Sequence, residues 1–381
     1  LPFVLVFSFY FIYKGLRTKK WIDFVIGGAF LGLGLHTYIA FRISPMILIA
    51  ILPFLILSRK NFLREYWKFI AIFAASAIII AAPMLYTFFY AHPEYFASRS
   101  DNVSVLSPEV NQGHLATTFL RSFGLSLAKY TFWGDQNWRH NYPPYPLLDF
   151  LTGIAFLFGF SVSIIQSFKL LYLRVFKKIR NPRLDIYVFL ISWFFIMLAP
   201  EFLTAEGNPH ALRAIGTVPV VFIFAGLAFD FVLKKSASYG YLYRKLVYLI
   251  IILMLVFIGI FNWTKYFIYW ANRIETARSF EKNITELSFY IKSLPPNLEV
   301  YTILDNMQRV PPRVFNWKNP NFHDLHPVDV EKLQPKNLTN FIVIFSDFEK
   351  DKIISSLTAK FPHLQLEEKI DKFGLKYYIL K

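Results

Sequence analysis

Eight continuous apolar segments alternate with short polar segments along the first 266 residues. A helix that crosses a bilayer needs about 20 mostly apolar residues, with about 17–25 usual. Continuous runs, without the two-residue alternation of barrel strands, favour helices. We therefore predict a polytopic transmembrane helix bundle of about eight spans, the first truncated, over residues 1–266. The segments are 1–13, 21–38, 43–58, 69–90, 147–171, 185–199, 214–233 and 246–266.

The polar segments between these runs differ in positive charge. The alternate connections, which include the large loop 91–146 and the segment 200–213, hold six Lys and Arg. Lys and Arg are retained on the cytoplasmic side of membrane proteins. We therefore expect a multi-pass protein of the cell membrane, with loop 91–146 and everything after residue 266 extracytoplasmic. The other four segments hold 18 Lys and Arg, in 14–20, 59–68, 169–183 and 234–245.

Residues 267–381 change character. An amphipathic segment, 267–294, ends at two prolines, and Ser346 with Glu349 forms an S-x-x-E capping pattern before a helix expected near 347–360. Apolar runs predict short strands, so we expect a small soluble extracytoplasmic α/β domain. The fold class is thus an all-α transmembrane bundle with a C-terminal α/β domain. The strands are expected at 298–304, 341–345, 364–369 and 375–380.

Composition agrees with a membrane protein. The chain is 55% hydrophobic and 17% charged, whereas soluble domains are about 45–50% apolar and about 25% charged. A net charge of +16 could indicate nucleic-acid binding, but the excess lies in short clusters beside apolar runs. We therefore expect the lipid bilayer as a partner and no nucleic acid. The absence of Cys excludes disulfides and thiolate metal sites.

The densest polar stretch of loop 91–146 lies at 132–141. Its Arg side chain offers planar donors suited to phosphate, and its Trp can stack on a sugar ring or lie at the bilayer interface. The alternative is a folded plug held by its own hydrogen bonds. The candidate residues for contact with a substrate or acceptor are Asp135, Asn137, Trp138, Arg139, His140 and Asn141.

Two further polar groups are expected on the same face. Arg213 begins a predicted span and could meet a lipid phosphate together with His210, or it could simply snorkel to the interface. Tyr38 and Arg42 lie four residues apart and share a face if the helix continues, although a belt of Tyr and Arg at the bilayer interface is the favoured explanation. Glu201 or Glu206 could assist a divalent ion, but metal-ligand spacing is absent, so no metal site is assigned.

A recurring pattern surrounds these residues. Residues 134–141 read Gly-Asp-Gln-Asn-Trp-Arg-His-Asn, followed by Pro-Leu-Leu-Asp at 146–149 and Leu-Thr-Gly at 151–153. With the stretches 209–219 and 32–45, this pattern resembles bacterial membrane glycosyltransferases of the glycosyltransferase C superfamily. Within that superfamily, the pattern resembles the relatives of the protein O-mannosyltransferase and aminoarabinose-transferase group. The resemblance covers roughly residues 1–235.

The resemblance implies an enzyme that moves a hexosyl or pentosyl group from a polyprenyl-phosphate carrier to a glycan, lipid or protein acceptor outside the cell. A divalent cation is an optional cofactor. Arg213, His210 and Arg42 are expected to hold the carrier phosphate, and loop 132–141 with Tyr38 to line the sugar or acceptor. The essential acid of the family lies in a first outer loop, expected to precede Leu1, so the catalytic base stays unassigned and the activity of this fragment open.

Other functions stay open from the residues alone. An oligosaccharide ligase or polymerase would also use Arg and His on the outer face, but without a metal or an upstream acidic loop. A lipid-linked-sugar transporter or flippase would place polar groups near the midplane, often in paired repeats. Asp23, Asp149 and Asp230 lie near predicted helix ends, which argues against an ion-coupled pump. A receptor that uses residues 267–381 is a further alternative, with no binding motif to support it.

Overall fold

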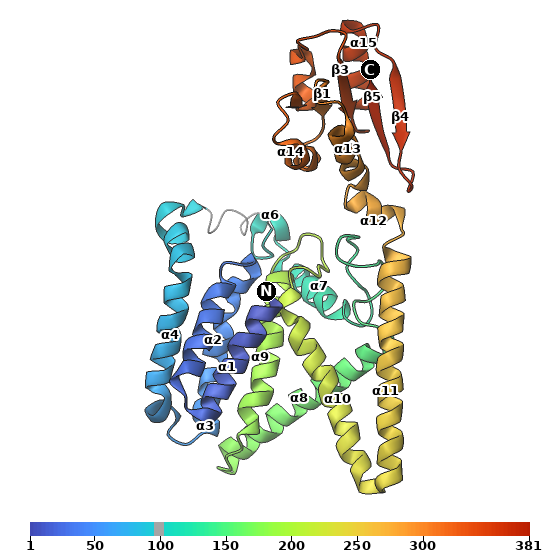
Figure 1. Cartoon of the computed structure of the whole chain (residues 1–381). Helices are drawn as coiled ribbons and strands as arrows, with labels where there is room; N and C mark the ends of the chain where they lie inside the picture. The colour runs from blue at the N-terminus through green and yellow to red at the C-terminus, as the bar shows by residue number, and fades with distance from the viewer. Residues whose placement is uncertain (95–102) are drawn as a thin grey trace. The chain divides into compact units, whose positions relative to one another are not determined.

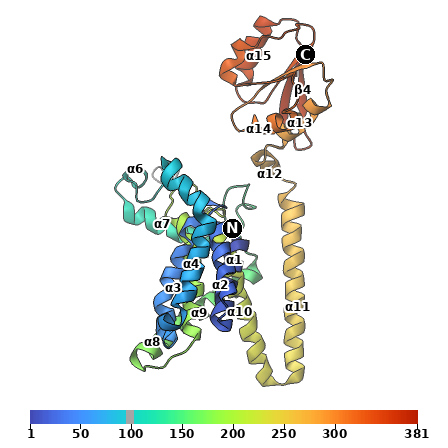
Figure 2. The same ribbon diagram turned by 60° about the vertical axis from the view of Figure 1, so that its left-hand side comes forward.

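The computed structural model describes residues 1–94 and 103–381, so residues 95–102 of the predicted loop 91–146 lie outside the described residues. The chain divides into two compact units, Leu1–Asn262 and Trp263–Lys381. The first is a bundle of apolar helices, and the second contains a five-stranded sheet (Figures 1 and 2). The predicted combination of an apolar helical bundle with a small C-terminal sheet is confirmed.

Six helices of the described residues are long and apolar enough to cross a bilayer, which indicates a multi-pass membrane protein. Each overlaps a predicted apolar segment. Several are extended by short 3-10 or π-helical turns. The helices are α3 (Pro45–Ser58) after η1 (Ile39–Ile43), α4 (Phe62–Tyr86) with η2 (Thr87–Ala91), α8 (Phe150–Phe176), α9 (Arg183–Phe202), α10 (Val218–Ser236) between η3 (Ile215–Thr217) and η4 (Ala237–Tyr239), and α11 (Tyr241–Trp263) with η5 (Thr264–Trp270).

The other two predicted spans form helices that are shorter than these six, when each of the six is counted together with its 3-10 or π-helical turns. Helix α1 (Pro2–Thr18) carries two basic residues in its second half, and α2 (Trp21–Gly34) has only 14 residues. The predicted span 21–38 is therefore too long at its C-terminal end. The helix ends where the ring of buried Phe41 packs on Gly34: a Cβ at that position would lie 1.9 Å from the ring, so this approach requires glycine.

Helices α2 and α4 pack with their backbones in close contact. A Cβ on Gly28 would lie 2.3 Å from the carbonyl oxygen of Phe73, and one on Gly32 would lie 2.4 Å from that of Ala77. The two glycines are four residues apart, so they form the small-xxx-small face typical of closely packed membrane helices. Figure 2 shows α2 and α4 beside each other in the bundle.

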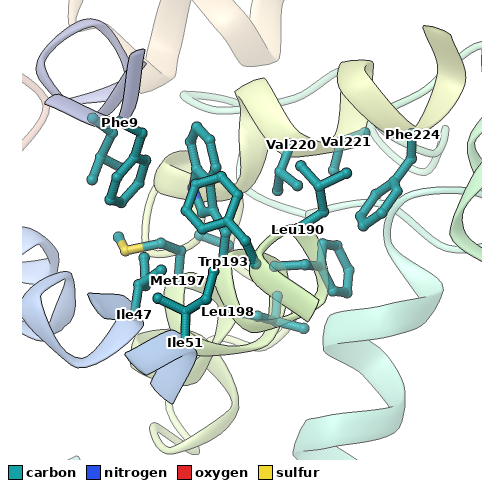
Figure 3. Packing of buried hydrophobic residues seen from close by; sticks show 14 of the residues in the cluster. Phe9, Ile47, Ile51, Leu190, Trp193, Met197, Leu198, Val220, Val221 and Phe224 are labelled. Carbon is teal, nitrogen blue, oxygen red and sulfur yellow. The ribbon is translucent and has the colours of Figure 1, made fainter. Parts of the chain in front are cut away.

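Helix α9 forms the centre of the helical unit. Its side chains Trp193, Met197 and Leu198 are buried and meet residues of α1, α3 and α10 (Figure 3). The indole Nε1 of Trp193 donates a hydrogen bond of 2.9 Å to the carbonyl oxygen of Gly216, so its one polar atom is satisfied inside an apolar core. Because α9 is fixed on several sides, its C-terminal end is a rigid support for the segment that follows.

The two ends of the bundle differ in chemistry. One end holds the turns α1–α2, α3–α4, α8–α9 and α10–α11, which are the four basic segments. Buried acids there are paired: Arg59 Nη2 lies 2.8 Å from Asp185, and Lys14 Nζ lies 3.0 Å from Asp23. The other end holds the long connections, including α6 (Pro108–Asn111) and α7 (Leu115–Ala128) (Figure 1).

The second unit is a mixed sheet with strand order β2-β1-β3-β5-β4. Strands β1, β2 and β3 are parallel, and β5 is antiparallel to both of its neighbours. Helix α15 covers one face and α13 the other, so β1 and β3 are buried on both faces. The elements are β1 (Glu299–Ile303), β2 (Phe322–Leu325), β3 (Phe341–Phe345), β4 (Leu366–Ile370), β5 (Lys376–Leu380), α12 (Ile274–Ser279), α13 (Lys282–Ser293), α14 (Val310–Asn316), η6 (Pro327–Lys332) and α15 (Lys350–Lys360).

Two details of this unit differ from the expectation. Strand β2 was not predicted, because it has only four half-buried residues, two of them polar. The capping box is wrong: α15 begins at Lys350, and Glu349 is its N-cap in the left-handed conformation. The hydroxyl of Ser346 instead bonds to Gln308 Oε1 at 2.7 Å, a distant partner that a local pattern cannot anticipate.

Candidate functional site

Two segments far apart in the sequence meet at the end of the bundle opposite the basic turns. We call residues 129–149 and 201–214 together the polar end. Backbone hydrogen bonds fasten the second segment to the start of the long connection: Val105 N–H donates to Leu203 O at 2.9 Å, and Ala205 N–H to Val103 O at 3.0 Å. Ser122 on α7 also donates to the carbonyl of Phe202 at 2.9 Å. These hydrogen bonds hold residues 201–214 against α7 and the start of the long connection.

The stretch 134–141 folds into consecutive turns stabilised by its own side chains. Asn137 N–H donates to Asp135 Oδ1 at 2.7 Å, and Arg139 N–H donates to Asn137 Oδ1 at 2.9 Å, two Asx turns in sequence. Asn141 Nδ2 donates to the carbonyl oxygens of Asp135 and Tyr145 at 3.0 and 2.7 Å. Asn137 and Asn141 therefore shape the loop, as the folded-plug alternative anticipates.

Asp135 joins the two segments of the polar end. Its carboxylate is 1% exposed. Oδ2 accepts a hydrogen bond of 2.6 Å from the backbone N–H of Ala211 and lies 3.2 Å from His140 Nδ1. A buried carboxylate needs such partners, because burial without them is costly. Asp135 consequently fixes the position of residue 211 relative to the 134–141 turns.

His140 and His210 lie next to each other beside this carboxylate. Their ring centroids are 4.7 Å apart, and one ligand atom from each of Asp135, His140 and His210 lies within 4.8 Å of the other two. Nδ1 of His210 is buried and has no hydrogen-bond partner within residues 1–94 and 103–381. Burial, followed by the charge of Arg213, lowers the pKa of His210 to about 4, so its imidazole is neutral near pH 7.

A buried ion pair lies below the histidines. Lys129 Nζ bonds to Glu201 Oε2, with both side chains at most 1% exposed. Glu201 Oε1 also accepts the backbone N–H of His210 at 3.0 Å. Burial lowers the pKa of Lys129, and the negative charge of Asp135 opposes this effect. The pair was not predicted from the sequence. Its one signal is that Lys129 and Glu201, although they lie in connecting segments, are each flanked by apolar residues.

Arg213 contacts an exposed acid. Its Nη2 lies 3.5 Å from Glu206 Oε2, and its Nη1 donates to the carbonyl oxygen of Glu206. Glu206 is paired with Arg213 and Glu201 with Lys129, and the suggestion that either acid assists a divalent ion stays a prediction. Asp135 provides the carboxylate beside the histidines.

The remaining candidates lie in different surroundings. Tyr38 has an extended backbone before η1, so it does not share a helical face with Arg42, and that expectation is wrong. The Arg42 guanidinium carbon lies 4.0 Å from the centroid of the Phe88 ring. Trp138 packs on Tyr142 with centroids 5.7 Å apart, and Arg139 is exposed.

No family model, curated protein or solved structure matches this chain. Function is therefore inferred from the chemistry of the polar end itself.

Proposed function

We propose that this protein is an integral-membrane glycosyltransferase. It moves a sugar from a polyprenyl-phosphate carrier to a glycan, lipid or protein acceptor. The observation that supports this most is the meeting of Asp135, His140, His210 and Arg213 at one end of an apolar bundle. Such an arrangement offers the Arg213 cation and the neutral imidazole of His210 to a lipid-linked phosphate.

Arg213 is the residue best placed for the carrier phosphate. Its guanidinium is mostly buried, 19% exposed, whereas its partner Glu206 is 69% exposed. The phosphodiester of the carrier has one negative charge, like a carboxylate, and its two free oxygens can take two parallel hydrogen bonds from a guanidinium, so it can replace the exposed Glu206 at this position. When the sugar leaves, charge grows on that phosphate, and a preorganised cation stabilises it. Arg213 therefore has a role in both binding and transfer.

The polar end faces the extracytoplasmic side in this proposal. The distribution of Lys and Arg supports it, because the basic segments all lie at the opposite end of the bundle. The chain lacks Cys, so single cysteines can be labelled without background. In intact cells, a membrane-impermeant maleimide should label Asn137→Cys and leave Arg180→Cys unlabelled until the cells are opened. The reverse pattern would contradict the orientation and, with it, the use of an outer-face carrier.

The activity test uses membrane vesicles that contain the protein expressed from its natural gene. Polyprenyl-phosphate mannose, glucose and aminoarabinose, each radiolabelled in the sugar, are supplied separately, and label in lipid and protein acceptors is measured. Loss of one charge-assisted hydrogen bond costs about 1.5–3 kcal/mol. Arg213→Ala should therefore slow transfer by about tenfold to a hundredfold, at about 1.4 kcal/mol per factor of ten.

Three variants serve as controls. Arg213→Lys keeps the charge but loses the planar fork, so an intermediate rate is expected. Glu206→Gln should leave the rate unchanged or raise it, because the competing carboxylate is gone. Arg180→Ala, an exposed arginine at the basic end, should transfer sugar at the wild-type rate. A normally expressed Arg213→Ala protein with the wild-type rate would remove Arg213 from the site. Movement of the labelled carrier between leaflets without transfer would favour a flippase.

A further inference from the structure

Three side chains at the polar end form a set of metal ligands that the sequence did not suggest. Asp135 and His140 come from one turn, and His210 comes from a segment 70 residues later. Their ligand atoms lie within 4.8 Å of one another. We propose that Asp135, His140 and His210 bind one divalent transition-metal ion of the Zn²⁺ class.

The distances suit a site that closes slightly on its ion. Ligand atoms held about 2.0–2.1 Å from a tetrahedral Zn²⁺ lie about 3.3–3.5 Å from one another. The Asp135 Oδ2 to His140 Nδ1 distance is already 3.2 Å. The larger separations in the set need a contraction of about 1.5 Å at most, which the 4.8 Å limit sets. Since rotation of His140 or His210 moves a ring nitrogen this far, no backbone rearrangement is required.

Nδ1 of His210 supports the site independently. This nitrogen is buried, and the described residues give it no hydrogen-bond partner. Buried polar atoms nearly always have a partner, so an unpaired one calls for an explanation. A hydrogen bond from His140 to Asp135 would satisfy those two residues alone and leave His210 unexplained. A metal ion bound through Nδ1 of His210 would give all three side chains a partner.

The ligand types identify the class of ion. Two imidazoles and one carboxylate are typical of Zn²⁺ and neighbouring transition metals, whereas Mg²⁺ and Ca²⁺ prefer oxygen ligands throughout. The nearby charges Lys129 and Arg213 are paired with Glu201 and Glu206, so they are largely neutralised. A +2 ion on one carboxylate keeps a net charge of +1. Its open position would accept water or an anion such as phosphate.

The buried acid below the site stabilises the histidine segment. Glu201 Oε1 accepts the backbone N–H of His210 and Asp135 Oδ2 accepts that of Ala211, so residues 210 and 211 are held from two sides. Ligands fixed by such secondary bonds bind metal more tightly. Asp135 is buried while His140 and His210 are half-buried, which leaves a path by which the ion can enter from solvent.

The test measures metal binding directly and needs no sugar substrate. Its outcome is therefore independent of the proposed transferase activity. The full chain is purified in detergent without a polyhistidine tag, stripped with a chelator, and titrated with Co²⁺ and Zn²⁺. Wild-type protein should bind about one equivalent. Co²⁺ should give visible absorption bands characteristic of nitrogen and oxygen ligands, and Zn²⁺ should displace it.

Variants assign the ligands. His210→Asn, His140→Asn and Asp135→Asn should each weaken Zn²⁺ binding by at least about tenfold. This is the lower end of the loss in affinity that follows when a residue supporting a metal ligand is removed. His114→Asn is the matched control: it is an exposed histidine on the same connection, and its affinity should equal that of wild type. Circular dichroism and size-exclusion profiles show that each variant is folded.

Three results would overturn the proposal. The first is a folded wild-type protein that binds neither Co²⁺ nor Zn²⁺. The second is wild-type affinity in all three ligand variants, which would place the ion elsewhere. The third is binding of Mg²⁺ in preference to Zn²⁺, since that preference requires an all-oxygen site.

Discussion

Removing one member of the buried Lys129–Glu201 pair should destabilise the helical unit far more than removing a surface charge. Both side chains are at most 1% exposed, so an unpaired partner would be left in the protein interior. Breaking a buried pair on one side costs about 3–5 kcal/mol. Lys129→Met leaves the carboxylate without its cation and should show a loss of this size.

The substitution at position 201 must keep an acceptor for the backbone N–H of His210. Glu201→Gln retains an oxygen for the His210 N–H, whereas Glu201→Leu would orphan that donor at about 1–3 kcal/mol. Glu201→Gln alone leaves Lys129 without its anion, so its loss of stability should be comparable to that of Lys129→Met. The double variant has no charge at positions 129 and 201, so we expect it within about 1–2 kcal/mol of wild type, because replacing both partners of a buried pair is often neutral.

The assay is reversible unfolding in mixed detergent micelles at pH 7, followed by circular dichroism. A double-mutant cycle gives the interaction free energy between residues 129 and 201, separated from the other effects of each single substitution. The control pair is Lys234 with Asp230, which are 77% and 52% exposed and should couple by about 1 kcal/mol or less. Additive losses at Lys129 and Glu201, or single losses as small as those at Lys234, would refute a tight buried pair.

Two further variants test packing and capping. Gly159→Ala places a methyl group 1.8 Å from the carbonyl oxygen of Phe224, so α8 and α10 must separate; we expect a loss of about 1–3 kcal/mol, against no loss for Gly226→Ala, which meets nothing within 4 Å. Asp149 caps α8 by accepting the Thr152 N–H at 3.0 Å, so Asp149→Ala should cost about 0.5–2 kcal/mol at pH 7. Burial raises the pKa of Asp149, but hydrogen bonds from Thr152 outweigh it and hold the pKa below 3.8. Because the pKa of Asp149 is depressed in the folded state, wild type should be more stable than Asp149→Ala above about pH 4, and this difference should decline on further acidification. A difference in stability that grows in acid would contradict this explanation.

The helices were predictable because each is a long apolar run that needs no distant partner to be recognised. The exact ends of the helices were harder to predict. The end of α2 depends on the Phe41 ring packed against Gly34, and η2 and η5 lengthen α4 and α11 beyond the expected limits. Strand β2 escaped notice because it is short and is stabilised by pairing with β1.

The polar end was predictable in part. The composition of 132–141 and of 206–213 marked both as chemically rich, but nothing in the order of residues places His140 against His210. That proximity depends on the bond from Ala211 N–H to Asp135, across 76 positions. The roles of Asn137 and Asn141 in shaping the turns likewise need coordinates, because an amide in a polar loop serves structure and binding equally well.

The shortness of α2 has a consequence for the surrounding lipid. Fourteen helical residues extend about 21 Å, whereas the hydrocarbon layer is about 30 Å thick. The tight backbone contact with α4 prevents α2 from moving away to relieve this hydrophobic mismatch. If α2 crosses the bilayer, the hydrocarbon layer must become thinner beside it, or the turn after Gly34 must enter that layer.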